Sequence, residues 1–228
     1  MGVGHIAVAL GAAKAVPRLN VGWLVFSALL ADFLLGIFAL AGLEHATVPP
    51  DYAARHYLLF TFPYSHGLLS LVLWAAIAGF LISWQRNVDR MQVFLVIAAV
   101  VLSHFVLDAA VHVAGLPLTG ENSPKIGLGL WEHLPLELSI ETLMTAVGIG
   151  IYLRVAGVGA PGLSRYGIPI FAAVVVVLTW TQLFAVVPPK PDQLTVGWIV
   201  APLVFSAIAY GLDIRRIRRG PPAETIPA

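Results

Sequence analysis

Charged residues are scarce in this chain, and cysteine is absent. Only 11% of the 228 residues are Asp, Glu, Lys or Arg, whereas a soluble domain carries about 25%. The lack of cysteine excludes disulfide bonds, thiolate metal ligands and cysteine nucleophiles, so any metal ion must be held by nitrogen and oxygen atoms. A formal net charge of +1 is too small to indicate nucleic-acid binding. A hydrophobic fraction of 59% indicates instead a membrane protein.

Long apolar runs are plentiful and predict an all-α integral membrane protein. A helix of about 20 mostly apolar residues crosses the hydrocarbon core of a bilayer. Six transmembrane helices are predicted, over residues 19–43, 64–84, 91–115, 134–153, 166–187 and 193–212. The stretch from Met1 to Val16 is apolar but too short to span. We expect it to form a short helix that is either re-entrant or interfacial, joined to the first span by a turn near residues 17–20.

Lys and Arg residues are divided unequally between the two sides of the predicted bundle. Ten of the 13 fall on the side that holds both chain ends: Lys14, Arg18, Arg86, Arg90, Arg154, Arg165, Arg215, Arg216, Arg218 and Arg219. The other side has only Arg55, Lys125 and Lys190. Because cytoplasmic loops carry the excess of basic residues, we predict that both termini are cytoplasmic.

Histidines suggest a division of the chain into parts. All seven lie within the first 133 residues, so residues 1–153 are interpreted as a helical core that carries a polar site. Residues 154–213 are interpreted as two scaffold transmembrane helices. Residues 214–228 are expected to form a disordered cytoplasmic tail.

Four of the 12 acidic residues lie within predicted spans, where no Lys or Arg is found: Asp32, Asp108, Glu137 and Glu141. An unpaired carboxylate in hydrocarbon is unfavourable by several kcal/mol. These four groups therefore require a cation, a proton or a wet cavity.

The third predicted span contains a polar stripe. His104, Asp108 and His112 are four residues apart, and this spacing places them on one face of a helix. His and carboxylate groups at this spacing can chelate one divalent metal ion. A proton relay and hydrogen bonding between helices are the alternative interpretations.

Other polar residues are predicted to lie at the depth of this stripe. Asp32 and His104 are each about 11 residues from the outer ends of their spans, hence at one level. If the N-terminal helix is re-entrant, His5 meets Asp32 in the middle of the membrane. His66, at the outer start of the second span, is predicted to be a ligand that faces Asp108.

Further residues are candidates for catalysis and substrate binding. Glu141 or Glu137 could act as a general base, and His112 could orient a water molecule or protonate a leaving group. Substrate contacts are predicted for Glu137, for the residues that precede His66, and for a lysine in the Gly-rich outer loop: Tyr64, Ser65 and Lys125.

Together these residues resemble the bacterial membrane-bound metal-dependent hydrolases. The resemblance is carried by Gly4-His5, Asp32, the tract Tyr64 to Leu69, Ser103-His104 with Asp108, and the tract Lys125 to Trp131. It covers roughly residues 1–145. A more distant similarity in ligand order is to zinc-dependent phospholipase C. The resemblance implies a divalent metal ion, expected to be zinc, with five ligands: His5, Asp32, His66, His104 and Asp108.

The resemblance also implies a location in the bacterial inner membrane and a hydrolytic function. We expect a metal-activated water molecule to act on a lipid or phosphoester near the outer leaflet, with membrane lipids as surroundings. Two alternatives belong to other classes. Buried acids and histidines also mark ion-coupled or proton-coupled transporters, and a polar cluster could serve only to lock the helices of a structural membrane subunit together.

Overall fold

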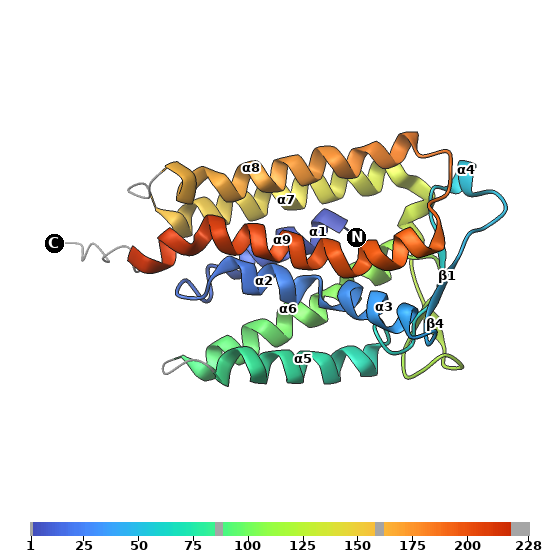
Figure 1. Ribbon diagram of the computed structural model, residues 1–228, viewed down its shortest axis with the longest axis horizontal. Coiled ribbons are helices and arrows are strands. Elements are labelled where there is room, and N and C mark those ends of the chain that lie inside the picture. The colour runs from blue at the N-terminus through green and yellow to red at the C-terminus, as the bar shows by residue number, and fades with distance from the viewer. Residues whose placement is uncertain (1, 85–88, 158–161, 220–228) are drawn as a thin grey trace.

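The computed structural model describes residues 2–84, 89–157 and 162–219, which form an elongated helical bundle (Figure 1). In chain order its elements are α1 (Gly2–Ala12), α2 (Val21–Ala28), α3 (Leu30–Leu40), β1 (His45–Thr47), α4 (Tyr52–Arg55), β2 (Leu59–Thr61), α5 (Leu68–Trp84), α6 (Arg90–Val111), β3 (Leu116–Pro117), β4 (Lys125–Ile126), the 3-10 helix η1 (Leu130–His133), α7 (Leu134–Ala156), α8 (Gly162–Trp180), the 3-10 helix η2 (Thr181–Phe184) and α9 (Pro191–Arg219).

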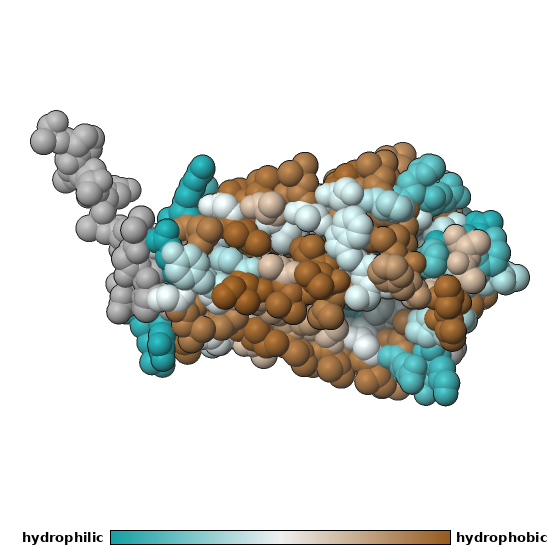
Figure 2. Space-filling view, turned by 90° about the horizontal axis from the view of Figure 1, so that it is seen from above, coloured by the Kyte–Doolittle hydropathy of each residue, from teal (hydrophilic) through white to brown (hydrophobic). Residues whose placement is uncertain are grey.

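Within the described residues, four helices are long and apolar enough to cross a membrane: α6, α7, α8 and α9. The helices α2 and α3 pass the same test only as a pair, which is bent by 52°. Two shorter apolar helices, α1 and α5, complete the bundle. Figure 2 shows apolar side chains over its middle and hydrophilic ones at its two ends. The helical fold suited to a membrane is confirmed, whereas the number of six spans stays a prediction.

The helix α1 lies inside the bundle. Its side chains Val3, Ile6 and Leu10 are at most 1% exposed, and it packs mainly against α7 and α2. Gly148 of α7 makes this close approach possible, because a Cβ atom at that position would lie 2.6 Å from the carbonyl oxygen of Ala7. Of the two positions predicted for the N-terminal helix, the interfacial one is therefore not observed.

The two ends of the bundle differ in structure. At the end opposite the C-terminal end of α9, two short antiparallel strand pairs and α4 cover the helices (Figure 1). In these pairs His45 lies opposite Thr61 and Leu116 lies opposite Ile126. We call this the strand end; it carries the residues predicted to be on the outer side.

At the other end the turn predicted before the first span is present. Asn20 caps α2, since its side-chain oxygen accepts a hydrogen bond from the Gly22 N–H at 2.8 Å. The helix α9 continues to Arg219 and so includes the first part of the predicted tail. Arg86 and the rest of that tail lie outside the described residues.

Two apolar core clusters meet in the middle of the bundle. One surrounds α1 and α2 and includes Leu29 and Val100, and the other surrounds α3 and α5 and includes Leu30 and Val101. The boundary between the clusters thus coincides with the break between α2 and α3. The polar residues of the candidate site begin at this level, with His104 on the next turn of α6.

Candidate metal centre

The polar stripe predicted on α6 is present and buried. His104 is 1% exposed, Asp108 is 2% exposed and His112 is 6% exposed. The Nε2 atoms of His104 and His112 lie 3.2 and 3.5 Å from Oδ2 of Asp108. Asp108 is thus placed between two imidazole rings of its own helix, as the spacing of four residues predicts.

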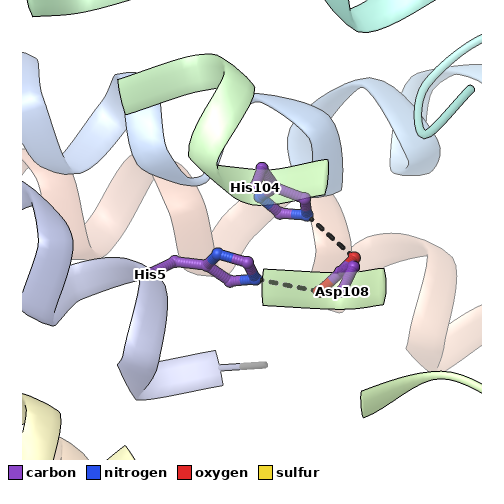
Figure 3. Close-up of side chains that lie close together, drawn as sticks. All are labelled: His5, His104 and Asp108. Carbon is purple, nitrogen blue, oxygen red and sulfur yellow. Dashed lines mark hydrogen bonds and ion pairs between the residues drawn. The ribbon is translucent and has the colours of Figure 1, made fainter. Parts of the chain in front are cut away.

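The helix α1 brings a third imidazole to Asp108. Nε2 of His5 lies 3.2 Å from Oδ1 of Asp108 (Figure 3). The His5 ring is stacked on the ring of His104, with centroids 3.8 Å apart and planes inclined by only 1°. Both carboxylate oxygens of Asp108 therefore face ring nitrogens, each from a different helix.

The break between α2 and α3 determines the orientation of the His104 ring. The carbonyl oxygen of Ala28, at the end of α2, lies 2.8 Å from Nδ1 of His104. Because a carbonyl oxygen can only accept a hydrogen bond, Nδ1 carries the hydrogen atom. In the neutral ring Nε2 then has a lone pair, and that lone pair faces the Asp108 carboxylate. Two electron-rich atoms at 3.2 Å need a proton or a cation between them.

His66, which precedes α5, and Asp32 of α3 complete the cluster. Nε2 of His66 lies 3.2 Å from Nε2 of His104 and 3.6 Å from Oδ2 of Asp108. Oδ1 of Asp32 lies 3.8 Å from Nε2 of His66 and 4.0 Å from Nε2 of His104. We use the name metal-ligand cluster for the five residues that the resemblance implies as ligands, which the structure brings together: His5, Asp32, His66, His104 and Asp108.

These separations fit a divalent metal ion. Ligand atoms that lie about 2.0–2.2 Å from a tetrahedral zinc ion are about 3.4 Å from one another. Two sets of three ligand atoms lie within 4.8 Å of one another, and His104 belongs to both: His5, His104 and Asp108, and Asp32, His66 and His104. A buried His/Asp group able to hold a metal ion is therefore present, while its geometry does not distinguish zinc from other divalent ions.

Glu44 and Ser65 hold His66 in place. The side chain of Glu44 accepts hydrogen bonds from the backbone N–H groups of Tyr64 at 2.7 Å and Ser65 at 2.9 Å. The Ser65 hydroxyl lies 2.7 Å from Nδ1 of His66. Outer partners of this kind fix the orientation of metal-ligating imidazoles. The hydroxyl of Ser65 is thus buried against His66, and the substrate contact predicted for Ser65 stays a prediction.

Glu44 was not among the residues predicted from the sequence, because it lies just beyond the first apolar run. It is 2% exposed, and this burial raises the pKa of its carboxyl group while the hydrogen bonds from Ser65 and Tyr64 oppose that shift. The only signal for it in the sequence is a carboxylate directly after the apolar run.

Glu137 and Glu141 lie on the buried face of α7, at 3% and 1% exposure. Oε1 of Glu141 accepts a hydrogen bond from the Gly4 N–H at 3.4 Å, next to His5. Among the described residues, Oε2 of Glu141 has no hydrogen-bond partner although it is buried. A buried carboxylate oxygen in that state is suited to accept a proton.

Aromatic side chains cover the cluster at the strand end. The ring centroid of His112 lies 4.0 Å from that of Trp131. The centroids of Phe60 and Phe62 lie 5.5 and 5.4 Å from the His112 centroid. The Gly-rich loop that ends at Trp131 packs against the end of α6. A Cβ atom at Gly127 would lie 2.3 Å from the carbonyl oxygen of His112, so this packing requires glycine.

Several predicted residues lie outside the cluster. Lys125 is exposed in β4. The side chain of Tyr64 is 51% exposed and its ring packs near Phe38. For Tyr64 and Lys125 a substrate contact stays a prediction.

Comparisons of the chain with protein-family models, with curated proteins and with solved structures found no match. The family resemblance therefore stays a prediction, and the geometry of the metal-ligand cluster is the main basis for a functional proposal.

Proposed function

We propose that this protein is a membrane-embedded metal-dependent hydrolase of the kind that its sequence resembles. One observation carries the proposal. The Nε2 lone pair of His104 faces the carboxylate of Asp108 and the ring of His66, inside a helical bundle suited to a membrane. A divalent cation, for which we expect zinc, satisfies all of these groups at once.

The residues of the cluster divide into ligands and supporting groups. His66, His104 and Asp108 would hold the ion, with Asp32 and His5 as further ligands. A divalent ion so held lowers the pKa of a bound water molecule to about 7 and polarises a carbonyl or phosphoryl oxygen. Glu141, with its unpartnered buried oxygen, is the group best placed to take up a proton, and His112 orients Asp108.

The expected substrate is a lipid or phosphoester near the outer leaflet of a bacterial inner membrane. The helix α6 ends at Val111, at the strand end of the bundle. His104 lies about 10 Å before this end, in the half of the helix that is nearer to the strand end. The basic residues predicted to be cytoplasmic lie at the other end, near Arg18 and Arg216. These positions support a site in the outer half of the bilayer with a cytoplasmic C-terminus. The N-terminal end of α1 lies inside the bundle beside Asp32, so the position of the N-terminus differs from the predicted cytoplasmic one.

Metal content tests the ligand assignment. Protein purified without chelator should contain a stoichiometric divalent metal by inductively coupled plasma mass spectrometry. His104→Ala and Asp108→Ala should lose it, because each removes a central ligand. His45→Ala is the matched control, since His45 is exposed in β1 and the variant should keep the metal. A wild-type protein free of metal would contradict the proposal and favour a purely structural polar cluster.

Glu141→Gln tests hydrolysis separately from metal binding. We expect this variant to keep its metal and to lose hydrolysis of a fluorogenic phospholipid panel by about 10²–10⁴-fold, the usual contribution of a general acid or base. Ion flux into proteoliposomes that disappears in Asp32→Asn, with no hydrolysis by the wild type, would instead indicate a transporter.

A further inference from the structure

A cavity of about 370 Å³ lies beside the metal-ligand cluster, between α3, α8 and α9. Ligand pockets have volumes of about 300–1,000 Å³, so this one is large enough for part of a small molecule or a lipid chain. In Figure 1 the N-terminal end of α1 is visible between α8 and α9, and Gly2 forms part of the cavity wall. The remaining walls come from the start of α3 and from facing residues of α8 and α9.

Asp32 connects this cavity to the metal-ligand cluster. Its side chain is 30% exposed, whereas those of His5, His66, His104 and Asp108 are at most 4% exposed. The other walls are mainly apolar, and include Leu29, Val175, Leu178, Trp198, Ala201 and Phe205. The cavity thus has one acidic side chain, Asp32, and mainly apolar walls elsewhere.

The outer surfaces of α8 and α9 indicate what surrounds the bundle beside this cavity. Val177 of α8 is 67% exposed, and Val200 and Leu203 of α9 are 47% and 46% exposed. Side chains of this kind face hydrocarbon when helices cross a bilayer. Phe60, Phe62 and Trp131 cover the cluster at the strand end, so a path from the cavity between α8 and α9 would lead to lipid.

A larger cavity of about 660 Å³ lies between α1, α6 and α7. Its walls include Ala7, Val96 and Leu143 and contain no ionisable side chain. None of the five cluster residues lines it, so of these two cavities it is the smaller one, at Asp32, that borders the site.

We propose that the cavity between α3, α8 and α9 binds a hydrocarbon chain of a membrane lipid, whose scissile ester or phosphoester group then lies at Asp32. This inference rests on the proposed function and names the substrate class of the same site. It also gives α8 and α9 a part in substrate binding, beyond the scaffold role predicted for them.

Photolabelling in lipid nanodiscs tests this inference directly. The probe is a phosphatidylcholine with a diazirine on one acyl chain, and labelled residues are identified by peptide mass spectrometry. In the wild type we expect labels on Leu29 and Val175, which are only 5% and 6% exposed, as well as on the outward-facing Val177. Labels on Val177 without any on Leu29 or Val175 would overturn the inference.

Blocking the cavity provides the matched comparison. A Cβ atom at Gly197, which lines the cavity, or at Gly211, farther along α9, meets no other atom within 4 Å. Gly197→Phe should abolish labelling of Leu29 and Val175 and leave that of Val177, whereas Gly211→Phe should label like the wild type. Persistent labelling of Leu29 and Val175 in Gly197→Phe would contradict the inference. Ala201→Phe is the second blocking variant should Gly197→Phe not give a monodisperse protein.

Metal content measured on the same samples separates the two proposals. Wild-type protein that lacks metal but is labelled at Leu29 and Val175 overturns the hydrolase and keeps the lipid-binding cavity. Wild-type protein that contains metal but is labelled only at Val177 overturns the cavity and keeps the metal centre.

Discussion

At the scale of single residues, His66 depends on side chains that do not belong to the metal-ligand cluster. Glu44 accepts hydrogen bonds from the N–H groups of Tyr64 and Ser65, and the Ser65 hydroxyl lies against Nδ1 of His66. His66 precedes α5 and is not part of a helix, so this chain of contacts replaces the rigidity that a helix gives to His104.

Glu44 should therefore affect metal binding without touching the metal. Glu44→Ala leaves two N–H groups without their acceptor, and we expect the metal affinity to fall about 10–100-fold, as for other outer partners of metal ligands. Glu44→Gln keeps an acceptor oxygen and should retain most of the affinity. Competition with a fluorescent chelator measures both. Equal losses in the two variants would show that the charge of Glu44, and not its hydrogen bonding, is what matters.

The raised pKa of Glu44 also predicts a dependence of stability on pH. The folded protein holds this proton to a higher pH than the unfolded chain, whose carboxyl has a pKa near 4.5. The free energy of unfolding of the wild type should therefore fall relative to that of Glu44→Gln as the pH rises above 4.5, and level off once the folded carboxyl is ionised. Thermal unfolding of both proteins over this pH range measures the difference in free energy of unfolding. A difference that does not change with pH would contradict the effect of burial on Glu44.

At the scale of helices, the site depends on two features of the N-terminal region. The break between α2 and α3 makes the Ala28 carbonyl available to His104. The insertion of α1 brings His5 to Asp108. Gly148 of α7 permits that insertion, since any Cβ atom there would collide with the backbone of Ala7.

Substitution of Gly148 should expel or shift α1. We expect Gly148→Leu to lower the free energy of unfolding by about 1–3 kcal/mol, the usual effect of overpacking, and to weaken metal binding because His5 moves. Gly150→Leu is the matched control on the same helix, where a Cβ atom meets nothing within 4 Å. Thermal unfolding and metal titration measure the two effects. Equal behaviour of the two variants would show that α1 is not held at Gly148.

At the scale of the whole molecule, a buried ion pair on α9 joins that helix to elements far away in the sequence. Asp213 of α9 is 0% exposed and accepts hydrogen bonds from the Val21 N–H at 2.9 Å and from the Tyr152 hydroxyl at 2.9 Å. Arg216 pairs with Asp213 and also donates to the carbonyl oxygens of Pro17 and Leu19. These contacts fix α9 to the turn that precedes α2 and to α7.

Asp213→Asn should destabilise the fold strongly. It leaves Arg216, whose side chain is 7% exposed, without its anionic partner, and removal of one member of a buried ion pair reduces stability by about 3–5 kcal/mol. Thermal unfolding in detergent measures the loss. Asp192→Asn, at an exposed position in the first turn of α9, is the control and should unfold like the wild type. A small change in Asp213→Asn would show that the pair is not needed for stability.

The sequence alone determined those features of the protein that depend on local spacing and composition. Apolar runs predicted the helices because the hydrophobicity of a segment depends only on the residues of that segment. The stripe of His104, Asp108 and His112 followed from the helical repeat. The shared depth of Asp32 and His104 followed from the helical rise. The full set of five ligands was implied by the family resemblance and not by these spacings.

Only the tertiary structure decided how these groups face one another. No Pro or Gly marks the break between α2 and α3 in the sequence, so the contact of His104 with Ala28 could not be predicted. The roles of Glu44 and Asp213 were missed for the same reason, since both lie outside the predicted spans and their partners are distant in sequence. The physical cause is common to all three: a hydrogen bond between separate elements depends on how whole helices pack, which local patterns do not specify.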